Sequence, residues 1–169
     1  RDLSVLYVDA DADFSDQYLG TRWGHASTAR RVSELCPVTL VGVRSMSLEE
    51  AEALSASSVR LFPLETDQSF TPVKDAWDAV VDSLTAHVYV SVDLDVFDPS
   101  FMAAVGTPEP GGLTWDEVSR LLEAVAAKKR IVGFDLTELA PDLGPKACAY
   151  AAAKLAYRLI GLALGPPEG

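Results

Sequence analysis

The feature that most constrains the fold is a regular alternation of short apolar runs with segments of helical periodicity. The apolar runs are expected strands at residues 3–8, 38–43, 59–63, 88–92 and 130–136. Expected helices cover residues 24–35, 47–56 and 144–164, and two more begin at Thr71 and Thr114. Such repeated strand–helix units, with strands apolar on both faces, are typical of a parallel sheet covered by helices. The sequence therefore predicts an α/β fold with at least five strand–helix units, in a single domain over residues 1–169.

Three of the expected helices carry start signals. Ser47 precedes an acidic first turn, and Thr114 is followed three residues later by Glu117, which is the pattern of a capping box. Thr71 is followed by Pro72, and proline is favoured at the first helical position. These signals indicate where the three helices begin.

Charge and composition exclude several classes of protein. The formal net charge is −11, which argues against a nucleic-acid partner and suits metals or amine-bearing substrates. No apolar run reaches the roughly 18–20 residues of a membrane span, because Lys154 and Arg158 interrupt the most apolar stretch. We therefore expect no membrane partner. Cys36 and Cys148 lie far apart and suggest neither a zinc site nor a disulfide scaffold, so we expect a cytoplasmic protein.

Acidic side chains gather at or just after the ends of three of the expected strands, where parallel sheets bind ligands. These residues are Asp9, Asp11, Asp13, Asp93, Asp95, Asp135 and Glu138. Two carboxylates about 4 Å apart repel by about 4 kcal/mol at an effective dielectric near 20. One aspartate at a strand end can simply cap the next helix, but two such clusters at one edge favour protonation or bound divalent cations. Manganese, magnesium and calcium suit carboxylate ligands best.

The motifs around these carboxylates resemble those of a known enzyme family. Residues 91–99 (SVDLDVFDP) and 106–113 (GTPEPGGL) are similar to the second metal motif of the ureohydrolases, the arginase and agmatinase family, and to the loop that follows it. Residues 9–13 (DADAD) resemble the family's Asp-Ala-His-x-Asp motif. Further matching segments lie at residues 18–20, 24–26, 41–45 and 138–141. The resemblance therefore covers essentially the whole chain, in order.

The resemblance implies a three-layer α/β/α sandwich around a mostly parallel sheet. It also implies two manganese ions, bridged by hydroxide, that hydrolyse a guanidinium group to urea and an amine. Asp9 and Asp93 would bridge both ions, while Asp13 would bind the first ion and Asp95 the second. Agmatine is the foremost substrate that the resemblance implies, and a homo-oligomer, trimeric or hexameric, is the expected assembly.

The catalytic residues that the resemblance implies are His25, Glu138 and Asp13. His25 would match the proton-shuttling histidine, and histidine is a natural proton donor near neutral pH. Glu138 would match the glutamate that pairs with the planar guanidinium, a geometry suited to bidentate hydrogen bonding. His25 could instead be a plain surface residue, and Tyr18 and Trp23 could line the pocket mouth or serve only in packing.

Two further residues admit a structural as well as a functional interpretation, and a third is expected to be structural only. Arg44, at a strand end, could hold a carboxylate of the site or form a structural ion pair. Glu109 lies in a Pro- and Gly-rich loop that is expected to border the site, and it could be a turn residue only. His87 immediately precedes a strand and is expected to be structural.

Two departures from the family pattern leave the activity open. Asp11 stands where the family has a histidine ligand of the second metal, so it adds a negative charge and favours a harder ion such as magnesium or calcium. The family's upstream histidine ligand has no counterpart in these residues. The chain begins at Arg1 rather than Met, and we expect it to be the C-terminal portion of a longer chain. The alternative is a catalytically impaired member that keeps the fold as an acidic metal-binding or assembly module.

Overall fold

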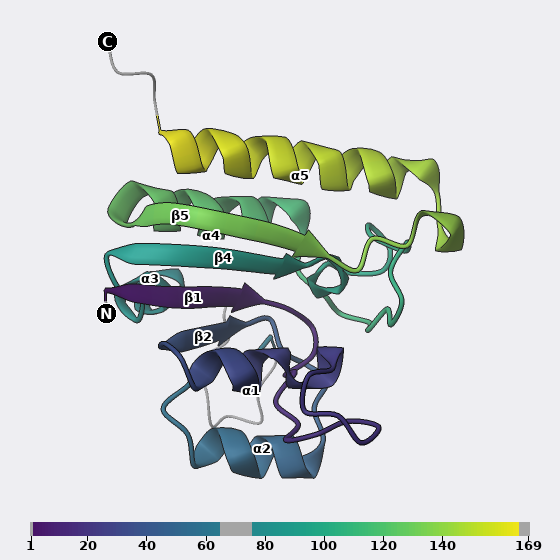
Figure 1. The fold of residues 1–169 in the computed structure, drawn as a ribbon. Coiled ribbons are helices and arrows are strands. Elements are labelled where there is room, and N and C mark those ends of the chain that lie inside the picture. Colours follow the sequence, from purple (N-terminus) through teal and green to yellow (C-terminus); the bar gives the residue numbers. More distant parts are fainter. Residues whose placement is uncertain (1, 65–75, 166–169) are drawn as a thin grey trace.

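A computed structural model describes residues 2–64 and 76–165 of the chain. Five parallel strands form one sheet in the order β3-β2-β1-β4-β5, with helices on both faces (Figure 1). The strands are β1 (Leu3–Val8), β2 (Val38–Val41), β3 (Arg60–Phe62), β4 (His87–Asp93) and β5 (Arg130–Thr137). The expected α/β fold with five strands is confirmed.

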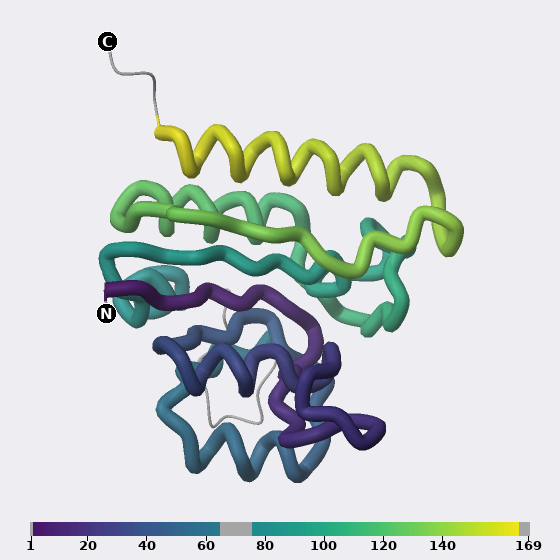
Figure 2. Tube along the Cα trace, in the orientation of Figure 1, coloured from purple at the N-terminus to yellow at the C-terminus, as the bar shows by residue number. Residues whose placement is uncertain are grey.

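The helices pack on the sheet in two layers. They are α1 (Thr28–Ser33), α2 (Leu48–Ser55), α3 (Trp77–Asp82), α4 (Trp115–Lys128) and α5 (Lys146–Leu164). Side chains alternate along β1, so Val5 and Tyr7 contribute to the core beneath α1 and α2, whereas Leu6 and Val8 contribute to the core beneath α3, α4 and α5. The trace in Figure 2 follows the chain through these layers, and the expected three-layer sandwich is confirmed.

Two of the start signals are confirmed, and both helices begin with a capping box in the structure. The Ser47 hydroxyl accepts the Glu50 N–H at the start of α2, and the Thr114 hydroxyl accepts the Glu117 N–H at the start of α4. Thr71, Pro72 and Val73 lie outside the described residues, as does the tail at residues 166–169, and α3 is described from Trp77 onward.

Two expected elements are shorter in the structure. The helix expected at residues 24–35 is a 3-10 turn, η1 (His25–Ser27), followed by α1, because the non-helical backbone of Ser27 interrupts it. The strand expected to end at residue 43 ends at Val41, because Gly42 turns the chain with a φ of +94°. A Cβ at Gly42 would lie 2.7 Å from the Val96 side chain, so the turn also needs the small residue.

The last helix differs from the expectation about membrane spans. Among the described residues, α5 is long and apolar enough to cross a membrane by length and composition alone, despite Lys154 and Arg158. Buried side chains of α5, among them Leu155 and Leu159, belong to the core beneath the sheet. Of its apolar window, 22% is buried inside the protein, and one such helix is weak evidence for a membrane span.

Candidate functional site

The two aspartate motifs meet because β1 and β4 are neighbours at the centre of the sheet. Val8 of β1 pairs with Val92 of β4 in parallel register, so Asp9 and Asp93 emerge side by side at the carboxyl ends. The Ala10 N–H donates a hydrogen bond to Asp95 Oδ1 at 3.2 Å, which links the motifs directly. The strand pairing therefore brings together carboxylates that lie more than 80 residues apart.

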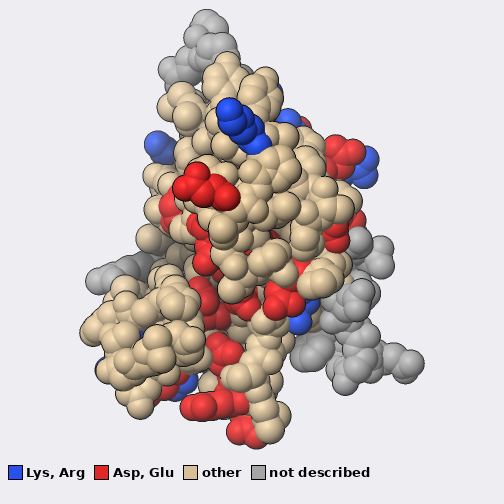
Figure 3. All heavy atoms as spheres, turned by 90° about the vertical axis from the view of Figure 1, so that its right-hand side faces the viewer, with Lys and Arg blue, Asp and Glu red and all other residues tan. Residues whose placement is uncertain are grey.

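The carboxylates are close enough to share cations. Oxygen atoms of Asp9, Asp11 and Asp95 lie within 4.8 Å of one another, and so do oxygen atoms of Asp93, Asp95 and Glu138. All five aspartates of the two motifs line a pocket of about 780 Å³. Figure 3 looks onto the carboxyl ends of the strands, and acidic side chains gather in the hollow of this face.

Backbone and hydroxyl donors orient most of these carboxylates. Asp9 Oδ1 accepts the Asp11 N–H at 2.8 Å, and Asp93 Oδ1 accepts the Asp95 N–H at 3.0 Å in the same way. Asp93 Oδ2 also accepts the Thr137 hydroxyl of β5 at 2.8 Å. The two motifs thus fold their own backbones around the acidic side chains.

Burial and mutual repulsion disfavour the ionised forms. Burial raises the pKa of Asp9 well above its ordinary value, and repulsion from Asp93 and Asp95 raises it further. Burial and then the Asp93 charge raise the pKa of Asp95 to about 8. Burial raises the pKa of Asp13 to about 7, although its hydrogen bond from Tyr7 acts in the opposite direction. The set of oxygen donors fits hard divalent cations, since positive charge would stabilise all of these carboxylates.

Asp13 lies apart from the tight carboxylate groups and is held differently. Its backbone is in the left-handed region, with a φ of +49°, which is uncommon for a residue other than glycine. The Tyr7 hydroxyl, from the interior of β1, donates a hydrogen bond to Asp13 Oδ2 at 2.7 Å.

Glu50 anchors the loop that follows Asp13. Its Oε1 accepts the Phe14 N–H at 3.0 Å and the Ser15 hydroxyl at 3.1 Å, while its Oε2 accepts the Ser47 N–H at 2.9 Å. Burial by itself would raise the pKa of Glu50, but these hydrogen bonds outweigh burial and lower it. One carboxylate therefore both caps α2 and fixes the wall of the pocket.

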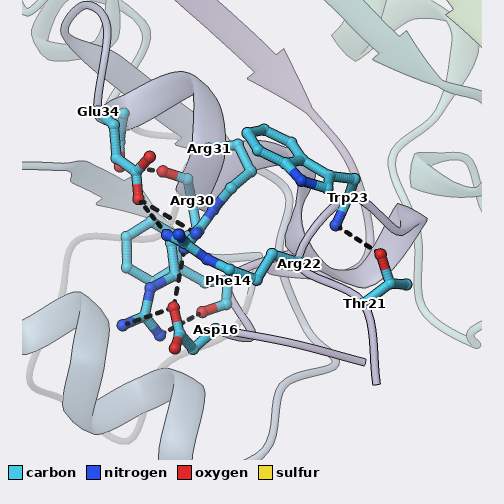
Figure 4. A network of polar contacts seen from close by, with 9 residues as sticks. Phe14, Asp16, Thr21, Arg22, Trp23, Arg30, Arg31 and Glu34 are labelled. Atoms are coloured by element: carbon cyan, nitrogen blue, oxygen red, sulfur yellow. Dashed lines mark hydrogen bonds and ion pairs between the residues drawn. The ribbon is translucent and has the colours of Figure 1, made fainter. Parts of the chain in front are cut away.

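A network of charged side chains ties the same loop to α1 (Figure 4). Arg31, which is only 8% exposed, contacts Asp16 at 3.0 Å and Glu34 at 3.2 Å. Arg30 contacts Asp16 at 3.6 Å, and its guanidinium also lies over the Phe14 ring at 5.7 Å. The network holds the start of the segment 14–27, which contains His25, against α1.

The expected catalytic side chains lie on the pocket wall. His25 and Tyr18 both line the pocket, and their rings meet edge to face at 5.2 Å. Trp23 is 78% exposed and is not part of the pocket lining. Glu138, with a φ of +64°, lines the pocket beside the aspartates, and burial followed by repulsion from Asp93 raises its pKa.

Four other acidic or basic residues have clear positions. The Arg44 guanidinium donates to the carbonyl oxygens of Asp95 at 2.8 Å and Glu109 at 2.7 Å, so it clamps the backbones of the site loops, a role the sequence did not suggest. Glu109 accepts this hydrogen bond through its carbonyl oxygen and is not among the pocket-lining residues.

His87 begins β4 and lies 3.2 Å from an Asp2 carboxylate oxygen, which agrees with a structural role. Asp135 lines the pocket but accepts the Ser91 hydroxyl at 2.9 Å.

Three residues that shape the site carried little signal in the sequence. Tyr7 and Thr137 lie inside or at the end of strands and appear there as strand formers. Glu50 appeared only as a favourable first-turn residue of α2. The alternation of side chains along β1 places Tyr7 on one face two residues before Asp9, and that period of two is the one signal that could have linked it to the site.

Comparisons with known proteins agree with this geometry. The N(1)-aminopropylagmatine ureohydrolase of Thermus thermophilus is 39% identical over 163 residues, which are 95% of this chain and 54% of the relative. The agmatinase of Pyrococcus horikoshii is 39% identical over 160 residues, which are 94% of this chain and 55% of the relative. The chain therefore spans about half the length of the curated relatives it matches.

A solved structure and a family profile extend the comparison. The crystal structure of agmatine ureohydrolase from Thermoplasma volcanium superposes with a TM-score of 0.82 and 35% identity, and the match covers 96% of this chain and 55% of that one. The profile of the arginase family matches residues 1–161. With this match over nearly its full length, the chain belongs to the arginase family.

Proposed function

We propose that this pocket hydrolyses the guanidinium group of a small cationic compound, with agmatine as the foremost candidate, to urea and an amine. The observation that carries the proposal is the convergence of aspartates from β1 and β4 in one pocket with His25 and Glu138 on its wall. The names of the relatives, agmatinase and N(1)-aminopropylagmatine ureohydrolase, support this class of substrate. We also place the protein in the cytoplasm as a homo-oligomer, on the grounds of its composition and its family.

The aspartates would hold divalent cations, two manganese ions per chain by family resemblance. The ligands would be Asp9, Asp11, Asp13, Asp93 and Asp95. All of them offer oxygen, so magnesium or calcium also fits this set. When bound, the cations supply hydroxide at neutral pH and polarise the bond to be cleaved.

The chain's own residues bind the substrate and move protons. The acidic pocket attracts a cationic substrate, and the Glu138 carboxylate accepts hydrogen bonds from the planar guanidinium. The oxygen of water is added to the guanidinium carbon, and the bond from that carbon to the alkylated nitrogen breaks. A ring nitrogen of His25 delivers the proton that the leaving amine requires.

Two measurements on purified protein test the proposal. After equilibration with manganese, elemental mass spectrometry gives the metal content per chain, and a urea assay with agmatine gives the rate. Replacing Asp93 and Asp95 by Asn is expected to abolish both tight metal binding and urea release. Asp135→Asn is the matched control, because Asp135 lines the same pocket outside the carboxylate groups that could hold an ion. Unchanged urea release in the double Asn variant would refute the proposed chemistry.

A second candidate is a catalytically impaired protein that keeps the fold as an acidic metal-binding or assembly module. Asp11 favours this candidate, because it adds a carboxylate where the family has a histidine. The variant Asp11→His, compared with the unmodified chain, tests this candidate. Urea release that rises strongly in the variant would indicate an enzyme impaired at this position, whereas no urea release from either protein, with metal bound, would support the module.

A further inference from the structure

We infer that Tyr7 is a positioning residue for Asp13, whose carboxylate it orients so that one oxygen is fixed and the other is presented to the cation centre. The inference rests on the proposed function, because it treats Asp13 as one of the cation ligands. Tyr7 also lines the pocket, and the role inferred for it is exerted through Asp13.

The contact between the two side chains is short and enclosed. The Tyr7 hydroxyl lies 2.7 Å from Asp13 Oδ2, and Tyr7 is only 7% exposed within the face of β1 that packs beneath α1 and α2. A hydroxyl donating to a carboxylate at this distance is among the stronger hydrogen bonds of proteins. Asp13 Oδ2 is therefore occupied within the protein, and Oδ1 is the oxygen left for an ion.

The peptide group that joins Asp13 to Phe14 is held at both its carbonyl and its N–H. Its carbonyl oxygen accepts the Arg30 N–H of α1 at 3.2 Å, and the next N–H, that of Phe14, is bound to Glu50 at 3.0 Å. These contacts hold the left-handed backbone of Asp13, a conformation that persists only where its surroundings determine it. With the backbone held, rotation of the side chain is the main freedom left, and the Tyr7 hydroxyl restricts that rotation.

Asp13 needs such a partner more than Asp9, Asp93 and Asp95 do. Asp9, Asp93 and Asp95 each accept a backbone N–H from within the two motifs. In the part of the chain that the structure describes, the hydrogen bond to the Asp13 carboxylate comes from Tyr7 instead. Removing the Tyr7 hydroxyl should therefore disturb Asp13 while leaving the other carboxylates in place.

The test measures manganese affinity by titration calorimetry in four proteins, namely the unmodified chain, Tyr7→Phe, Asp13→Asn and the double variant. Loss of a group that orients a metal ligand typically weakens metal binding by about 10- to 100-fold. We expect Tyr7→Phe to weaken binding by about tenfold or more, and to cause no further loss when Asp13→Asn is already present. Such non-additivity would indicate that Tyr7 acts through Asp13. A general packing defect would instead lower the manganese affinity equally in the unmodified chain and in Asp13→Asn.

A matched control and a stability measurement accompany the titration. Tyr89→Phe removes a hydroxyl from the neighbouring strand β4, and it should leave manganese affinity unchanged. Denaturation of each variant in the absence of cations shows whether the fold is retained.

The outcomes separate this inference from the proposed function. Equal affinity in Tyr7→Phe and the unmodified chain, or a further tenfold loss in the double variant, would overturn the role of Tyr7 while leaving the metal centre standing. Absence of manganese binding in the unmodified chain would overturn both. Manganese binding without urea release would count against the proposed reaction, and the role of Tyr7 would still be decided by the four affinities.

Discussion

Removing divalent cations should make the stability of this protein fall as the pH rises, which is the reverse of the usual behaviour of carboxylates paired with cations. The pKa of Asp13 is raised to about 7 and that of Asp95 to about 8, first by burial and then, for Asp95, by the Asp93 charge. A carboxyl group whose folded-state pKa is raised stabilises the protein below its unfolded pKa, and that contribution is lost as the pH rises through the folded-state pKa.

The magnitude follows from the size of the pH window. For each group, the free energy of unfolding falls by about 1.4 kcal/mol per pH unit between about pH 5.5 and the folded-state pKa. Between about pH 5.5 and 8.5, the contribution of Asp13 to this free energy would therefore fall by about 2 kcal/mol, and that of Asp95 by about 3 kcal/mol. The two groups titrate within one cluster, so their losses do not simply add, and we expect the free energy of unfolding to fall by about 2–4 kcal/mol.

The assay is urea denaturation in a chelator at the two pH values, followed by the same measurement with excess manganese. Manganese at about 100 times its dissociation constant should restore about 2.7 kcal/mol at the higher pH. Asp95→Asn should make the metal-free protein more stable at the higher pH, because the amide keeps the hydrogen bond from Ala10 without the charge. Equal or greater stability of the chelated protein at the higher pH would refute the electrostatic argument.

Three further substitutions have defined expected outcomes. Thr114→Ala removes the α4 cap and should lower the free energy of unfolding by about 1 kcal/mol in chemical denaturation. Gly112→Ala would place a Cβ 2.2 Å from backbone atoms of Phe97 and Asp98, so thermal denaturation should show a loss of about 3 kcal/mol or more. Arg44→Lys cannot reproduce the fork of hydrogen bonds to backbone carbonyls, and hydrogen exchange should show faster opening of residues 106–112.

The fold could be predicted from the sequence because its signals are local. Apolar strands, helical periodicity and the caps at Ser47 and Thr114 each depend on neighbouring residues, and all reappear in the structure. The predicted ends of helices and strands are less accurate where tertiary contacts determine them. Gly42 ends β2 early because the chain must pass close to Val96, a residue more than 50 positions away.

The convergence of the acidic residues could be predicted from the sequence, whereas the residues that support them could not. The aspartates can be recognised because they directly follow expected strands, and the carboxyl ends of parallel strands lie at the same edge of the sheet. Glu50 and Arg44 act through contacts that no sequence spacing reveals, and only the period of two along β1 links Tyr7 to the site. Arg44 shows the difference most clearly, because the sequence leaves open a site carboxylate or a structural ion pair, whereas its guanidinium holds the carbonyl oxygens of two separate loops.

The central pairing of β1 with β4 also bears on how the protein folds and unfolds. Ala10 and Asp95, which join the two motifs, are 85 residues apart, so the complete set of carboxylates exists only after a very long loop of chain has closed. A cation that needs both motifs has little to bind before that pairing forms. Added manganese should consequently lower the unfolding rate far more than it raises the refolding rate. The ion would then stabilise the folded sheet kinetically.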